Sequence, residues 1–187
     1  MPRNHVVSLP RRRFLAGAAV VGSAAALGRA APAAAALRPE RALSLYSIHT
    51  KEALEIAYWA DGRYVKGALA AIDYHLRDFR TDEVHSIDAR LLDLVHRLNQ
   101  RLGNRHPVHV ISGYRSPRTN AMLASRSSRV STTSYHMQGR AIDIRLPGCR
   151  LEVVREAALV LAGGGVGYYP DERNNFVHLD TGPVRNW

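Results

Sequence analysis

The sequence has few of the features that cross-link or anchor small domains. It contains one cysteine among 187 residues, Cys149, so an internal disulfide is impossible. Cys149 follows Pro147 and Gly148 in an expected turn, which favours a structural or incidental thiol over a metal ligand. The chain shows no internal repeat, no long linker, and no helix-turn-helix, zinc-finger or aromatic RNA-binding signature. We therefore expect no nucleic-acid partner.

The N-terminal segment lacks acidic residues altogether. Residues 11–15 read Arg-Arg-Arg-Phe-Leu, an apolar alanine-rich run follows over residues 16–27, and no acid precedes Glu40. The apolar run is shorter than the roughly 20 residues that a membrane-spanning helix needs, so we expect no stable membrane span after processing. The pattern is typical of a twin-arginine export signal over residues 1–36, cleaved near Ala36. Without cleavage, the same segment would be a tether facing the same compartment.

Half of the net positive charge belongs to this segment. The formal net charge is +10, and residues 1–36 contribute five arginines and no acid, which leaves +5 for residues 37–187. These remaining residues, about 150, are enough for one domain with a hydrophobic core. A mild positive charge favours an anionic partner surface, although it is equally common on domains without one.

Two strand-like segments carry a candidate metal site. His136 precedes a stretch in which Asp143 alternates with apolar residues, and 35 residues later His178 and Asp180 share one face of a second alternating stretch. Because alternate residues of a strand point to the same side, these side chains can face one groove. Two imidazoles, one carboxylate and an open position form the ligand set of a catalytic zinc ion, which activates a water molecule.

Each of these residues also has an ordinary interpretation. Asp143 could form an ion pair with Arg140 or Arg145, yet an acid within an apolar strand needs a partner, and a metal is one. The chain has nine histidines. We interpret seven of them as surface or core residues: His5, His49, His75, His85, His96, His106 and His109.

These motifs resemble those of a known peptidase family. The string Ser-x-His-x-x-Gly-x-Ala-x-Asp over residues 134–143, with His178 on a later strand, resembles the zinc signature of the LAS metallopeptidases. These include D-Ala-D-Ala carboxypeptidases, dipeptidases and hedgehog-like domains. The chain is most similar to their murein endopeptidase K branch. That resemblance covers roughly residues 40–187 and includes the segments 112–116, 164–170 and 176–182.

The resemblance implies roles for several residues. Zn²⁺ would be held by His136, Asp143 and His178. Arg115 would stabilise the oxyanion that forms from the peptide carbonyl, although it could instead open the turn at Pro117 and pair with a surface acid. The implied substrate-binding residues, which would shape the pocket, are Tyr114, Ser112 and Ser134.

The general base is not assigned by the resemblance. Many LAS enzymes have a glutamate three residues before the last histidine ligand, whereas this chain has Asn175, which is not a useful proton acceptor. Asp180 is the candidate, either as the base or as a carboxylate that orients His178. Asp171 and Glu172, in the preceding polar loop, are weaker candidates.

The expected function is a zinc-dependent murein endopeptidase that hydrolyses peptide cross-links of peptidoglycan in the periplasm or cell envelope. By resemblance, the bond would lie at or near meso-diaminopimelate or D-alanine, and the sequence does not identify which. Two alternatives stay open: a D,D- or L,D-carboxypeptidase on wall peptides, and a non-catalytic wall-binding module whose zinc site is structural. The twin-arginine export machinery would be a partner.

The expected fold is α+β, a small antiparallel sheet with packed helices, like that of D-Ala-D-Ala peptidases and hedgehog-like domains. Apolar spacing and turn residues place the strands at 42–48, 52–58, 108–112, 141–146, 166–169 and 176–179. The first two would form a hairpin, although residues 52–58 could also form a helical turn. Helices are expected at 68–76, 87–102, 116–127 and 151–161. The polar loop 126–134 could bind peptide carboxylates, although its composition equally describes a mobile surface connection.

Overall fold

A computed structural model describes residues 40–171 and 175–187. The export signal predicted at residues 1–36 lies outside the described residues. Within the described part of the chain, no helix is long and apolar enough to span a membrane.

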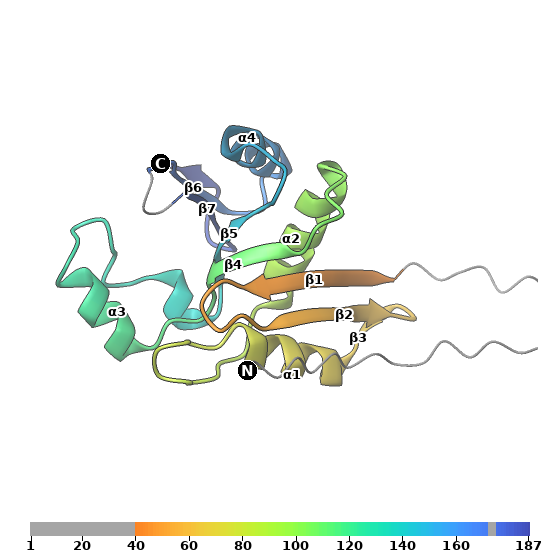
Figure 1. The fold of residues 1–187 in the computed structure, drawn as a ribbon, viewed down its shortest axis with the longest axis horizontal. Coiled ribbons are helices and arrows are strands. Elements are labelled where there is room, and N and C mark those ends of the chain that lie inside the picture. The colour runs from red at the N-terminus through yellow and green to blue at the C-terminus, as the bar shows by residue number, and fades with distance from the viewer. Residues whose placement is uncertain (1–39, 172–174) are drawn as a thin grey trace, which may run out of the picture. The chain divides into compact units, whose positions relative to one another are not determined.

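All strands belong to one eight-stranded sheet, which has the spatial order β3-β2-β1-β4-β5-β7-β6-β8 among the described residues (Figure 1). The bounds of the strands are β1 Arg41–Ser47, β2 Ala53–Ala60, β3 Arg63–Tyr64, β4 Val108–Ser112, β5 Ala141–Arg145, β6 Gly165–Tyr169, β7 Phe176–Asp180 and β8 Arg185–Asn186. The predicted hairpin of the first two strands is confirmed, because β1 and β2 pair antiparallel. Residues 52–58, for which a strand or a helical turn was possible, belong largely to strand β2.

The α+β class is confirmed, but the sheet is larger than predicted and it is mixed rather than antiparallel. β4 lies parallel to β1, with Leu45 opposite Val108, and β8 lies parallel to β6. Alternation in a sequence tells which side chains are buried, but it does not tell which strand will be the neighbour. Two helices lie between the hairpin and β4, and a connection of that length can return the chain in the same direction.

Four helices accompany the sheet: α1 Lys66–His75, α2 Ala89–Arg101, α3 Pro117–Ala124 and α4 Leu151–Leu161. Asp88 and Ser116 cap α2 and α3 by accepting hydrogen bonds from backbone amides of their first turns. The apolar stripe of α2 is buried, and it consists of Leu91, Leu92, Leu94, Val95 and Leu98. Each fully buried leucine contributes roughly 1.5–3 kcal/mol relative to exposure, which holds α2 in the core.

The centre of the sheet sets up the candidate site. Asp143 on β5 lies directly opposite His178 on β7, and the short 3₁₀ helix η1, Tyr135–Gln138, immediately precedes β5. Figure 1 shows α3 to the side of the sheet, apart from α2 and α4. The loop that follows α3 leads back to η1, so it borders the same part of the molecule.

Candidate metal centre and cleft

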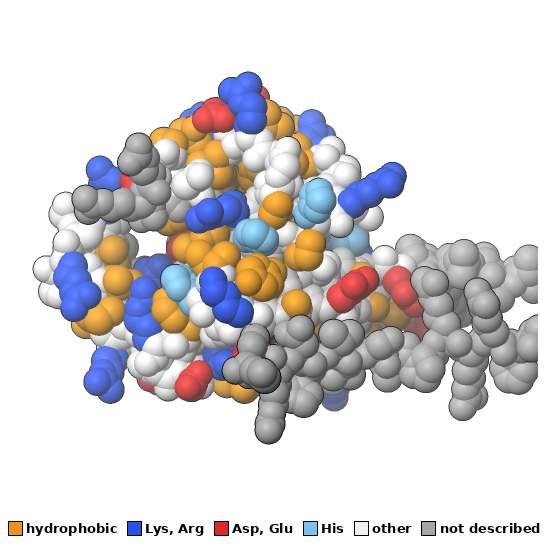
Figure 2. Space-filling model, viewed as in Figure 1, with side chains coloured by type: hydrophobic (Ala, Val, Ile, Leu, Met, Phe, Trp, Pro, Cys, Tyr) orange, Lys and Arg blue, Asp and Glu red, His pale blue; other side chains and the backbone are white. Residues whose placement is uncertain are grey.

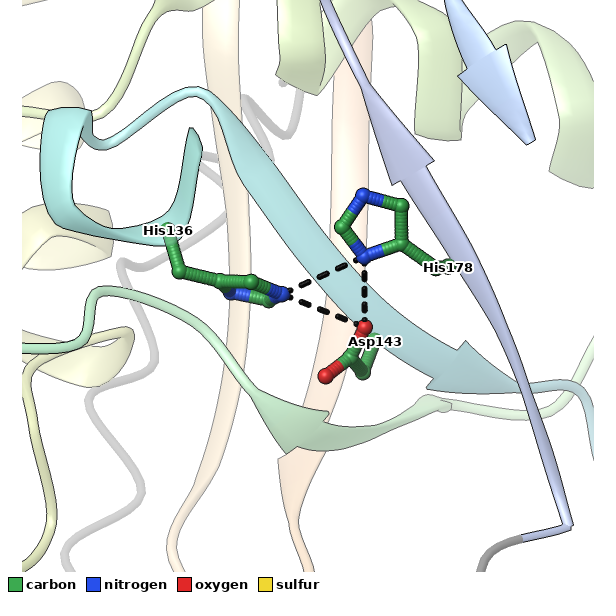
Figure 3. A group of neighbouring side chains, drawn as sticks. All are labelled: His136, Asp143 and His178. Atoms are coloured by element: carbon green, nitrogen blue, oxygen red, sulfur yellow. Dashed lines mark hydrogen bonds and ion pairs between the residues drawn. The ribbon is translucent and has the colours of Figure 1, made fainter. Parts of the chain in front are cut away.

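Three side chains from η1, β5 and β7 converge on one point (Figure 3). His136 Nε2 lies 3.2 Å from Asp143 Oδ1 and 3.2 Å from His178 Nδ1, and the last two atoms are 2.8 Å apart. All three residues are buried. The structure therefore brings together the three residues that the sequence motif predicted as metal ligands.

The turn at Gly139 aims His136 at this point. Gly139 has a φ of 63°, in the left-handed region that favours glycine, and a Cβ there would collide with the backbone oxygen of Ser86. At the start of η1, the Ser134 hydroxyl accepts a hydrogen bond from the His136 amide at 3.3 Å. Both ends of this short helix are thus fixed by local sequence.

Hydrogen bonds on the far sides of the two imidazoles fix their tautomers. His136 Nδ1 lies 2.7 Å from the carbonyl oxygen of Gly113. Because a carbonyl oxygen only accepts, Nδ1 carries the proton and Nε2 presents a lone pair to the cluster. His178 Nε2 lies 3.1 Å from Asp180 Oδ2, so the same argument leaves the lone pair of His178 on Nδ1.

The three facing atoms fit a divalent metal. Two lone pairs and a carboxylate oxygen repel one another unless a cation or a proton lies among them. Ligand atoms 2.0–2.2 Å from a tetrahedral zinc ion are about 3.3–3.6 Å apart, slightly more than the 2.8–3.2 Å between these three atoms. Among the described residues, no fourth histidine, cysteine, aspartate or glutamate joins the group. The donor set is that of an open zinc site.

The electrostatics of the cluster agree with this. Burial lowers the pKa of His136, which keeps it in the neutral, ligating form. Burial by itself would raise the pKa of Asp143, but the charge and hydrogen bonds of His136 and His178 hold it well below the usual range. Burial likewise opposes a charge on His178, yet hydrogen bonds to Asp143 and Asp180 raise its pKa. The two carboxylates thus attract positive charge to the place a metal would take.

Asp180 is saturated with hydrogen-bond donors. It is fully buried, and its Oδ1 accepts from the amides of Gly165 and Gly182 at 3.1 and 2.8 Å. Arg185 donates to both carboxylate oxygens at 3.1 and 2.7 Å. Burial would raise the pKa of Asp180, but its bonds to His178 and Arg185 hold that pKa well below the ordinary range. Of the two roles left open by the sequence, these contacts favour orientation of His178.

Arg185 is a site residue that the sequence did not identify. It belongs to β8, which has only two residues and therefore shows no periodic pattern. Its only signal in the sequence is a basic residue five positions after Asp180, beyond the turn-forming pair Gly182 and Pro183.

Arg115 lies beside the three candidate ligands. Its Nη2 is 3.5 Å from Asp143 Oδ2 and its Nη1 is 3.5 Å from Asn120 Oδ1. Its buried Nε has no hydrogen-bond partner among the described residues. The acid that it faces is the buried Asp143 and not a surface residue. A guanidinium with spare donors at this place can bind an oxygen that develops negative charge.

A cleft of about 710 Å³ opens above the three candidate ligands. It is lined by Arg115, Leu123, Arg126, Ser127, Arg129, Val130, Ser131, Thr133, Ser134, Tyr135, His136, Gln138, Asp143, Tyr169, Phe176, His178, Arg185 and Trp187. Figure 2 shows basic side chains gathered on the part of the surface that Figure 1 assigns to α3, beside a hollow in the same face.

Two of the predicted substrate-binding residues do not line this cleft, whereas Ser134 does. Tyr114 is buried and its ring stacks on that of His85 at 4.7 Å. Ser112 is buried in β4, opposite Asp143 in the sheet register. Neither side chain is among those that line the cleft, so their role in shaping the pocket stays a prediction. Tyr114 directly precedes Arg115, and successive side chains of an extended chain point to opposite sides.

No further carboxylate lines the cleft among the described residues, apart from Asp143. Asn175 is exposed in the loop before β7, and its backbone N–H donates a hydrogen bond to the backbone carbonyl of Asp171 at 2.9 Å. The Asp171 carboxylate contacts Arg129 at 3.4 Å and borders a neighbouring hollow. Glu172, the other loop acid considered, lies outside the described residues.

Comparisons with known proteins agree on one family. The family model described as "Peptidoglycan L,D-endopeptidase MepK" matches residues 35–187. The chain is 44% identical over 178 residues to the peptidoglycan L,D-endopeptidase MepK of Escherichia coli K12, covering 95% of this chain and 96% of that one. It is 42% identical over 148 residues to a probable MepK of Haemophilus influenzae, covering 79% and 78% of the two chains.

Among solved structures, the L-Ala D-Glu endopeptidase ChiX of Serratia marcescens matches with a TM-score of 0.39 and 14% identity. The match covers 61% of this chain and 87% of that one. A similarity at this level carries no argument about fold or function.

Proposed function

Because the chain belongs to the peptidoglycan L,D-endopeptidase MepK family of the M15 peptidases, we propose that it is a zinc-dependent murein endopeptidase. It hydrolyses peptide cross-links of peptidoglycan. The observation that supports zinc is the convergence of His136 Nε2, Asp143 Oδ1 and His178 Nδ1 at the floor of the cleft. The finer assignments below are part of the same proposal.

The residues around the candidate ligands have separate roles in hydrolysis. When bound, zinc supplies Lewis acidity, which polarises the peptide carbonyl and lowers the pKa of water to about 7. Arg115 donates to the carbonyl oxygen as its negative charge develops. Ser134 lines the cleft and fixes the start of η1, which carries His136. Asp180 orients His178, because proton transfer by Asp180 would require it to leave at least one of its present donors.

The ligand geometry does not support the alternative function, a wall-binding module with a structural zinc site. A structural zinc has four protein ligands, whereas only three candidate ligands meet here among the described residues. They meet at a cleft large enough to admit a peptide.

The location of the enzyme follows from its substrate and from the N-terminal sequence. A chain that acts on peptidoglycan works in the cell envelope. We propose that residues 1–36 are a twin-arginine signal, that export uses the twin-arginine machinery, and that residues 37–187 form one peptidase domain. Sequencing the N-terminus of the mature protein tests the first two points. A start near Leu37 supports them, and an intact N-terminus in the envelope indicates a tether instead.

Hydrolysis is tested on purified cross-linked sacculi with the zinc-loaded mature protein and its His178→Ala variant. We expect soluble muropeptides from the first and none from the second, and the products identify the bond. Release of D-alanine alone would indicate a carboxypeptidase. Absence of any release, with zinc bound and sacculi retained on the protein, would overturn the proposal in favour of a wall-binding module.

A further inference from the structure

The lining of the cleft carries an excess of positive charge. Four of the lining residues are arginines, at positions 115, 126, 129 and 185, and the only carboxylate among the lining residues belongs to Asp143. The two arginines nearest the cluster already have partners: Arg185 binds Asp180, and Arg115 faces Asp143. The other two arginines, Arg126 and Arg129, lie in the loop that follows α3, and neither is bound to a residue of the candidate site.

These two arginines have spare capacity. Arg129 makes one long contact, at 3.4 Å, with an oxygen of Asp171, and its side chain is 72% exposed. An exposed pair of this kind is weak and is screened by salt. Within the described part of the chain, the guanidinium of Arg126 has no hydrogen bond or ion pair. A guanidinium offers five donors in a plane, and those of Arg126 are free to bind a ligand.

Positive charge is concentrated around Arg126. The pKa of the neighbouring Arg80 is lowered, first by burial and then by repulsion from Arg115 and Arg126, although Asp78 opposes this. Arg80 therefore lies within electrostatic reach of both Arg115 and Arg126, two arginines that line the cleft. A bound anion offsets this positive charge, and a low-dielectric cleft of one sign attracts such ligands.

Aromatic side chains also line the cleft. The rings of Tyr169 and Phe176 stack at 4.7 Å, and Trp187 Nε1 donates to the Tyr169 hydroxyl at 2.8 Å. Arginines and aromatic rings in one cleft fit a chain with apolar stems and carboxylate ends, which is the chemistry of an acidic peptide. Arginine suits a carboxylate better than lysine does, because its planar group binds both oxygens.

We propose that the loop containing Arg126 and Arg129 is a carboxylate-recognition subsite, through which the cleft selects wall peptides with free rather than amidated carboxyl groups. Arg126 is the principal contact, and Arg129 contributes less because Asp171 competes for it. This inference rests on the proposed function for the identity of the peptide. The subsite itself stands on the arrangement of charge.

Equilibrium binding tests this subsite separately from catalysis. The probe is an uncross-linked diaminopimelate stem peptide, prepared with free carboxyl groups and as its carboxamide, and titrated calorimetrically into the zinc-loaded mature protein. We expect the acid to bind about 10- to 100-fold more tightly than the amide, the range for one hydrogen bond to a charged group. In Arg126→Gln, the ratio of the affinity for the acid to the affinity for the amide should fall towards one, because the acid binds more weakly. Arg126→Lys should give an intermediate ratio, and Arg129→Gln a smaller loss.

Arg118→Gln is the matched control, because Arg118 is an exposed arginine on α3 that does not line the cleft. Its ratio should equal that of the wild type. Equal affinity of the wild type for acid and amide would overturn the subsite, as would an unchanged ratio in Arg126→Gln. Both results are independent of sacculus hydrolysis. A protein that binds the acid selectively but releases no muropeptides keeps the subsite and loses the proposed function.

Discussion

His178 Nε2 lies 3.1 Å from Asp180 Oδ2, on the side of the ring opposite to the nitrogen that faces His136 and Asp143. This contact fixes which nitrogen of His178 can bind a metal. Asp180 is itself held by Arg185 at 2.7 Å. The chain therefore orients a candidate ligand through a buried carboxylate and an arginine from a strand of two residues.

Removal of the Asp180 carboxylate tests whether it orients or catalyses. In Asp180→Asn, we expect zinc affinity to fall about 10- to 100-fold, the usual effect of losing an outer-shell partner. Competition with a chromogenic chelator measures this, and Arg185→Gln should shift the affinity in the same direction. An Asp180→Asn protein with wild-type zinc affinity but no turnover would instead identify Asp180 as the general base.

Substitution of Arg115 should separate turnover from metal binding. With Arg115→Ala, we expect kcat on sacculi or cross-linked peptides to fall about 100- to 1000-fold, as for other donors to an oxyanion. Zinc stoichiometry should stay at the wild-type value, because the three candidate ligands remain. Steady-state kinetics and metal analysis together measure this. A rise in KM at constant kcat would assign Arg115 to ground-state binding instead.

Gly139 should be needed for both stability and metal binding. In Gly139→Ala, the added Cβ meets the backbone of Ser86 in a conformation with φ of 63°. We expect a loss of at least about 1 kcal/mol in the free energy of unfolding, together with weaker zinc binding because η1 moves. Gly67→Ala is the control, since nothing lies within 4 Å of its added Cβ. Equal behaviour of the two variants in denaturant unfolding and zinc titration would refute this.

Asp78 should make stability depend on pH. It is buried, and it accepts hydrogen bonds from the amides of Ser116 and Arg80 at 2.9 and 3.0 Å. Burial raises its pKa, but these bonds and one from Thr119 outweigh burial, so the folded-state pKa lies below the unfolded one. Its contribution is therefore complete above the unfolded value and is lost as pH falls through the folded value.

The measurement is the melting temperature of the wild type and Asp78→Asn across acidic pH. We expect the variant to be about 1–3 kcal/mol less stable at neutral pH, and the difference to shrink on acidification. A difference that stays constant with pH would show that ionised Asp78 is not what holds the start of α3.

Much of the local structure could be predicted from periodicity. The helix at 151–161 was predicted with the bounds that the structure has, because its apolar spacing ends at a glycine run. The helix predicted at 116–127 ends three residues early, at Ala124, since Ser125 forms the C-cap. Apart from the hairpin of β1 and β2, the neighbours of the strands could not be predicted, because alternation is the same for parallel and antiparallel partners.

The residues of the candidate site likewise could be predicted in part. The motif and strand alternation pointed to His136, Asp143 and His178, and the structure brings them together through the pairing of β5 with β7. Arg185 reaches Asp180 only through the pairing of β8 with β6, a tertiary contact that leaves no pattern in the sequence. Ser112 and Tyr114 were expected to help shape the pocket because they lie near Arg115 in sequence, and neither lines the cleft. Tyr114 and Arg115 are successive residues of an extended chain, so their side chains point to opposite sides.

The central claim is that the three converging residues hold one catalytic zinc ion. Its most direct test adds zinc to metal-free mature protein and follows bound metal and muropeptide release from sacculi in the same samples, for the wild type and Asp143→Ala. We predict that release rises in proportion to bound zinc, saturates at one ion per chain, and is lost with zinc binding in Asp143→Ala. Full release and full zinc content in Asp143→Ala would contradict the claim.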